Sequence, residues 1–292
     1  MAKRFFCSRN GNLKPALQIV ALLAAIQAAS FLFWFVYALL GFSLNNNPIA
    51  ANMLLYVALS AVVWLLFTKL NRADASAIGF ASGINRLWEG FGLGFAAITL
   101  NAALLYAFGG IKPVSVTFDA GIFLMFAYFL LVALFEEAMS RGYIQNALYI
   151  STNKPISAIC ASAAFSMLHF FNPSYSILAA ANIFLVGIAF SMMAFKTGSL
   201  YAPIGFHWSW NFFQGNIYGI PVSGLSSQVT LITTQRVHDS IFNGGSFGAE
   251  GGLFCTLAIA CTILYIAVFM KEGPANGELE RLKRENTPNP AV

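Results

Sequence analysis

The sequence predicts an all-α, polytopic membrane protein of about eight transmembrane helices, and three observations support this prediction. Of its 292 residues, 58% are hydrophobic and only 9% are charged, whereas soluble domains carry about 25% charged residues. The apolar residues form eight segments, most of them near the roughly 20 residues that a helix needs to cross a bilayer. The basic residues gather in alternate connections between these segments, as the positive-inside rule expects of cytoplasmic loops.

The expected helices are separated by polar connections that contain Asn, Gly and Pro, which are typical of turns. The first helix follows basic residues, as a signal peptide would, but its apolar run exceeds the 7–15 residues of a signal peptide. We therefore expect it to be retained. In chain order, the eight expected spans are residues 16–42, 51–69, 88–108, 121–148, 155–171, 176–195, 201–220 and 252–270.

Residues 1–271 are expected to form a single transmembrane domain with its functional site in the interior of the helix bundle. Residues 272–292 read as a short polar cytoplasmic tail, and their composition predicts disorder. Residues 221–251 form a polar, Gly-rich loop that contains no recognisable motif. The chain shows no internal repeat, which disfavours an inverted-repeat transporter.

The charge distribution predicts the orientation. With eight spans, both termini and every second loop lie on one side of the membrane. That side carries every Lys and Arg except Lys112 and Arg236, which fall on the opposite side, and Arg141, which lies in the fourth span. We therefore expect a multi-pass protein of the bacterial inner membrane with both termini in the cytoplasm. Because the basic residues are spread over loops and tails, the pI of about 9.1 does not indicate a nucleic-acid partner.

The four cysteines contain no CxxC pair, and three of them lie in or beside apolar segments. They are expected to be small buried hydrophobic residues rather than metal ligands or disulfides.

The first polar cluster lies inside the fourth span and reads Glu136-Glu137-x-x-x-Arg141. A charge at the centre of a bilayer costs roughly 2.5–3.5 kcal/mol on insertion scales, so such groups usually mark function. Glu137 and Arg141 are i,i+4 neighbours and can form an ion pair on one helix face. Glu136 points about 100° away from Glu137 and has no obvious local partner, which makes it the stronger functional candidate.

The second cluster is Phe165-x-x-x-His169 in the fifth span. Glu136 lies about 16 residues before the turn near Thr152 and His169 about 16 residues after it. At 1.5 Å per residue, an antiparallel hairpin brings both to the same depth, roughly 24 Å from the turn. An isolated membrane histidine is often an interhelical hydrogen-bonding group, but this shared depth favours a common site.

The third cluster is His207-x-x-x-Asn211, early in the seventh span. Its i,i+4 spacing places an imidazole and an amide on one helix face. The intervening Trp208 and Trp210 read as interfacial aromatic residues.

Taken in order, EExxxR, FxxxH and HxxxN, each on its own membrane helix, resemble the CPBP family, which includes CAAX prenyl endopeptidases and bacteriocin-processing or self-immunity proteins. The surrounding residues Glu136–Tyr143 and Ala202–His207 also match the family pattern. The resemblance covers about residues 121–214, and the rest of the chain matches only generically.

The resemblance implies an intramembrane endopeptidase that cuts membrane-associated substrates, such as CAAX-type or bacteriocin-like proteins. It implies that Glu136 is the general base and that His169 helps to orient and activate water. His207 and Asn211 would donate hydrogen bonds to the oxyanion, with Glu137, Arg141 and Phe165 in support.

Amide hydrolysis needs a base, oxyanion donors and an acid for the leaving amine, and this residue set supplies all three. No Ser or Cys lies in a nucleophile motif such as GxSxG, so activated water is favoured. Zinc held by His169, His207 and Glu136 is an alternative. The compact HExxH pattern is absent, and we expect no cofactor.

Two other classes of function stay open. A non-catalytic immunity or chaperone protein would use the same polar cluster for binding, and a transporter would use it as a proton relay. The expected partners are membrane lipid and a membrane-associated peptide or protein, and the sequence does not determine the oligomeric state.

Overall fold

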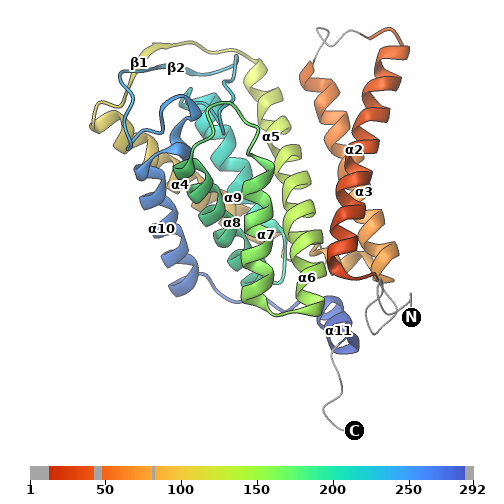
Figure 1. The fold of residues 1–292 in the computed structure, drawn as a ribbon. Coiled ribbons are helices and arrows are strands. Elements are labelled where there is room, and N and C mark those ends of the chain that lie inside the picture. Colours follow the sequence, from red (N-terminus) through yellow and green to blue (C-terminus); the bar gives the residue numbers. More distant parts are fainter. Residues whose placement is uncertain (1–12, 43–47, 81–82, 287–292) are drawn as a thin grey trace.

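The computed structural model describes residues 13–42, 48–80 and 83–286, and within them the chain is a bundle of helices (Figure 1). The predicted all-α, polytopic membrane fold is confirmed. In order, the elements are α2 (Pro15–Leu39), α3 (Pro48–Asn71), η1 (Ala75–Ile78), α4 (Asn85–Ala107), β1 (Ile111–Val116), α5 (Gly121–Glu137), η2 (Ala138–Gln145), α6 (Asn146–Ser151), α7 (Lys154–Leu168), α8 (Ile177–Thr197), α9 (Tyr201–Phe212), η3 (Phe213–Ile217), β2 (Ile232–Arg236), η4 (Gly245–Phe247), η5 (Ala249–Gly251), α10 (Leu253–Val268) and α11 (Gly277–Asn286).

A helix occupies each of the eight expected spans. Within the described residues, five helical segments are long and apolar enough to cross a membrane: α2, α3, α4, the continuous α5–η2–α6 segment and α8. Two further spans, α7 and α10, are apolar but shorter. The remaining span is α9, which continues into the π-helical turn η3.

Close backbone contact between α4 and α9 fixes the helix that carries the third motif. A Cβ at Gly90 would lie 1.9 Å from the carbonyl oxygen of Ala202, and a Cβ at Gly205 would lie 2.0 Å from that of Leu87. Small residues at such positions let two membrane helices approach closely. Larger side chains would therefore push α9, and His207 with it, away from α4.

One end of the bundle is covered by a segment that the all-α prediction did not foresee. We call residues 218–252 the cap. Its strand β2 pairs antiparallel with β1, with Ile111 opposite Arg236 and a register irregularity between Pro113 and Ser115. The β-branched residues of both strands favour this extended pairing. Figure 1 shows β1 and β2 at the end of the bundle opposite α11.

The prediction that the tail after residue 271 is disordered is wrong for residues 277–286, which form α11. Its Leu279 and Leu282 are 5% and 2% exposed and anchor the helix to the bundle. Acidic residues in its first turn and basic residues in its last turn complement the helix dipole. The remainder of the predicted tail, residues 287–292, lies outside the described residues.

Candidate active site

The two glutamates of the first motif have different environments. Glu137 is fully buried and pairs with Arg141, whose Nη1 donates to Glu137 Oε1 at 2.9 Å. Glu136 retains 22% side-chain exposure. The helix changes to the π form directly after Glu137, and π turns within α-helices occur frequently at functional sites.

Arg141 is fully buried and contacts other helices of the bundle. Its guanidinium carbon lies 4.5 Å from the ring centroid of Phe165 and 4.9 Å from that of Phe190, distances that allow cation–π attraction. Its Nη2 donates to the carbonyl oxygen of Gly187 at 3.2 Å. At Gly187 an added Cβ would lie 2.9 Å from the Cβ of Ser162. The close approach of α8 to α7 at this point therefore requires glycine. Phe165 therefore packs directly on Arg141.

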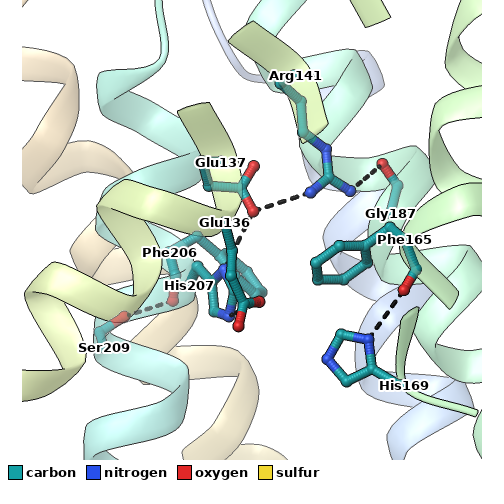
Figure 2. A network of polar contacts seen from close by, with 9 residues as sticks. All are labelled: Glu136, Glu137, Arg141, Phe165, His169, Gly187, Phe206, His207 and Ser209. Carbon is teal, nitrogen blue, oxygen red and sulfur yellow. Dashed lines mark hydrogen bonds and ion pairs between the residues drawn. The ribbon is translucent and has the colours of Figure 1, made fainter. Parts of the chain in front are cut away.

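His207 connects the two glutamates (Figure 2). Its Nδ1 lies 3.0 Å from Glu137 Oε1 and its Nε2 lies 3.8 Å from Glu136 Oε2. The carboxylate of Glu137, paired with Arg141, is an acceptor, so Nδ1 carries the hydrogen and donates to it. This bond fixes the orientation of the ring and leaves Nε2 directed at Glu136.

His169 caps the end of α7 and has a similar arrangement. Its Nδ1 lies 2.9 Å from the carbonyl oxygen of Phe165, which can only accept, so Nδ1 donates. Nε2 is then left as the second functional nitrogen of the ring. Figure 2 shows that this nitrogen lies on the side of the ring nearer Glu136 and His207.

A single cavity joins the predicted residues. Its volume is about 460 Å³, and its lining includes Glu136, Phe165, His169, His207 and Asn211. Asn211 lies one helical turn beyond His207, and its side-chain amide has no hydrogen-bond partner among the described residues. The lining of one cavity thus contains residues of all three separated motifs: Glu136 with His207 close to it, Asn211, and His169 on the opposite side.

Comparison with known protein families gives a match over this same part of the chain. Residues 118–213 match the family described as type II CAAX prenyl endopeptidase Rce1-like. The CPBP resemblance is confirmed. The match contains all three motifs and leaves residues 1–117 and 214–292 outside. It supports a CAAX-type intramembrane protease in general terms. No curated protein matches the chain.

The structure adds a third carboxylate that lies outside the CPBP motifs. Glu250, in the cap, is 8% exposed and lines the same cavity as Glu136. Its Oε2 accepts from Gln214 Nε2 at 2.6 Å and from the backbone N–H of Ser223 at 3.1 Å. Burial raises the pKa of Glu250. Sequence analysis missed this residue; the available signal was a single acid in a Gly-rich stretch directly before an apolar span.

A polar residue of α8 also helps to hold the cap and was missed. The side-chain nitrogen of Asn182 donates to the carbonyl oxygens of Glu250 and Gly252 at 2.7 and 2.9 Å. An amide inside an apolar helix was a visible signal, but its partners lie about 70 residues away, and no local pattern indicates them.

The zinc alternative named Glu136, His169 and His207. Glu136 and His207 are close to each other, but His169 lies across the cavity from them (Figure 2). Among the described residues, no three His, Cys, Asp or Glu side chains are grouped as a bound metal ion would need. Because His207 Nδ1 bonds to Glu137, only Nε2 of this ring is free to bind a ligand or substrate in the cavity.

Proposed function

We propose that this protein is an intramembrane endopeptidase that hydrolyses peptide bonds of membrane-associated substrates with water activated by Glu136. The observation that supports this most strongly is the difference between the paired glutamates. Glu137 is committed to Arg141 and His207, whereas Glu136 lines the cavity and keeps an accessible carboxylate. A carboxylate next to a cavity is placed to act as a general base.

The proposed reaction uses the groups that surround Glu136. Glu136 removes a proton from water, and the oxygen of that water attacks the scissile carbonyl carbon. His169 orients the water through Nε2, and Asn211 donates to the negative oxygen of the tetrahedral intermediate. His207 donates to the same oxygen from Nε2 as an imidazolium, the form in which both of its ring nitrogens are donors. When the C–N bond breaks, the proton held by Glu136 passes to the leaving nitrogen.

The first test replaces the general base. We expect Glu136→Gln and His169→Ala to abolish cleavage while the protein still inserts and folds, because the buried contacts of Glu137 with Arg141 and His207 are kept in both variants. Exposed residues provide the controls: Glu272→Gln and His238→Ala should cleave at the parent rate.

The substrates are found by mass spectrometry of membrane peptides from cells that carry the parent chain or Glu136→Gln. CAAX-type and bacteriocin-like proteins are the classes to examine first. Peptide products that depend on Glu136 support the proposal. Full cleavage of any such substrate by Glu136→Gln would refute the proposed mechanism. Unchanged cellular activity of Glu136→Gln without any Glu136-dependent product would favour a protein that acts by binding.

We further propose that the reaction needs no metal. The purified protein is expected to contain far less than one zinc ion per chain when measured by elemental mass spectrometry, and chelators should leave turnover unchanged. Stoichiometric zinc whose removal stops cleavage would instead assign Glu136, His169 and His207 as ligands.

A further inference from the structure

The cavity extends from its catalytic groups toward the capped end of the bundle. Beside Glu136 and His207, its lining includes Pro48 and Ile49 at the start of α3 and residues 225–229 of the cap. Figure 1 shows that the starts of α3 and α5 and the strands β1 and β2 all lie at this end. The start of α2 and the helix α11 lie at the other end.

Toward the α11 end, the cavity is closed. Every residue from 137 to 147 is buried, and Arg141 fills the space between the rings of Phe165 and Phe190. A separate small cavity of about 40 Å³ lies beyond Arg141 and is covered by Leu279 and Glu280 of α11. A peptide therefore has no route to Glu136 from the α11 end.

The charges at the two ends differ in a way that indicates the orientation. In the described part of the chain, only Lys112 and Arg236 lie at the capped end. The basic residues at the α11 end are Lys14, Lys69, Arg72, Arg86, Lys154, Lys196, Lys271, Arg281, Lys283 and Arg284. Because Lys and Arg are retained on the cytoplasmic side of a membrane protein, the α11 end belongs in the cytoplasm.

From these three observations we propose that the site receives its substrate and its water from the extracytoplasmic side. The substrates would be peptide segments that have already crossed the membrane or are exposed on its outer face, rather than the cytosolic ends of proteins. This inference rests on the proposed protease function, and it narrows the class of substrate for the same cavity.

The charge of the cavity defines the peptide further. Among the described residues that line it, none is Lys or Arg, while Glu136 and Glu250 are acidic. Most of the other lining residues are apolar or aromatic. A free C-terminal carboxylate or an acidic segment would meet no cationic partner there, and its desolvation would be uncompensated. An apolar segment with neutral or basic flanks fits this lining.

The orientation is tested by labelling single cysteines in intact cells. In a chain whose four native cysteines are replaced by Ala, Ser226→Cys lies on the exposed cap and Ala275→Cys lies at the exposed α11 end. A membrane-impermeant maleimide should label Ser226→Cys at once and label Ala275→Cys only after the cells are opened. The reverse pattern would overturn the inference without affecting the proposed hydrolysis.

Access is tested with membrane vesicles of defined sidedness. The probe is a quenched fluorescent peptide with an apolar centre of ten residues and two lysines at each end, which keep it on one side of the membrane. Right-side-out vesicles should cleave it at least about tenfold faster than inverted vesicles, and detergent should remove the difference. Vesicles that contain Glu136→Gln serve as the negative control. A peptide with glutamates in place of the lysines should be cleaved more slowly.

The outcomes separate the inference from the proposed function. Faster cleavage by inverted vesicles, or cleavage only after detergent is added, would overturn the extracytoplasmic entrance while the protease assignment stands. If detergent-solubilised protein cleaves neither this peptide nor any membrane peptide in a Glu136-dependent way, the protease assignment fails. The labelling experiment then decides by itself which side the cavity faces.

Discussion

The floor and the cap of the cavity are built in different ways. The floor consists of Glu137, Arg141 and His207, which lie on two helices and are joined by short bonds between charged and polar side chains. The cap is held mainly by amide side chains that bond to backbone carbonyls, as Asn216 does to Val229 at 2.6 Å and Gln214 to Pro221 at 2.6 Å. The floor is therefore held by a few buried charges and the cap by a larger number of neutral bonds. In the proposed mechanism, the floor supports the chemistry and the cap lines the entrance.

The largest effect should come from breaking the floor. Arg141→Lys keeps the charge but loses the planar fork that reaches both Glu137 and Gly187 and the stacking on two rings. Complete loss of one partner of a buried ion pair typically costs about 3–5 kcal/mol. Arg141→Lys should lose part of this, so we expect a clear loss of thermal stability in detergent and no cleavage. The unfolding transition and the cleavage rate of the purified variant measure both effects.

The matched control for Arg141 is a partly exposed ion pair. Arg86 pairs with Glu89 at the α11 end, and both side chains are about a quarter exposed. Exposed pairs contribute about 0–1 kcal/mol, so Arg86→Lys should leave stability and cleavage nearly unchanged. Equal losses for the two substitutions would contradict the structural role given to the floor.

A smaller effect is expected at the wall of the cavity. Asn211→Ala removes a proposed oxyanion donor that has no other partner among the described residues, so the fold should persist. The loss of one such donor lowers kcat by about 10²–10³-fold, with KM little changed. Steady-state kinetics on a substrate found by mass spectrometry measure this.

The comparison for Asn211 is a polar residue on the cap side of the same cavity. Gln228→Ala lies near the proposed entrance and should raise KM more than it lowers kcat. If Asn211→Ala instead raises KM alone, its amide binds the substrate and does not stabilise the transition state.

The same contrast explains which features the sequence predicts. Glu137 with Arg141, and His207 with Asn211, are four residues apart on helices, and this spacing alone places each pair on one face. The shared cavity of Glu136 and His169 also follows from counting residues to the turn between α6 and α7. These features depend only on the regular repeat of the α-helix, so they can be predicted from a single sequence.

The cap and α11 were not predicted, for a physical reason. Glu250, Asn182 and Gln214 interact across about 36 to 70 residues, and no periodic pattern marks their partners. The segment that forms α11 is polar overall, which led to the prediction of disorder. Its two buried leucines, Leu279 and Leu282, are three residues apart and so lie on one helix face. This spacing was the local signal that the segment forms a helix that packs on the bundle.

The smallest and most specific effect should be the pH dependence of the cap. Burial raises the pKa of Glu250, so between its unfolded and folded pKa values the folded chain holds a proton that the unfolded chain has lost. The free energy of unfolding therefore falls as pH rises from about 4.5, the ordinary pKa of the group, by at most about 1.4 kcal/mol per pH unit.

Glu250→Gln keeps the size of the side chain and removes this dependence of stability on pH. The melting temperatures of the parent chain and of Glu250→Gln, measured across this pH range, should converge at its acid end. Asp239→Asn, an exposed cap residue, should leave the slope intact, and a slope that survives Glu250→Gln would assign the titration to another group.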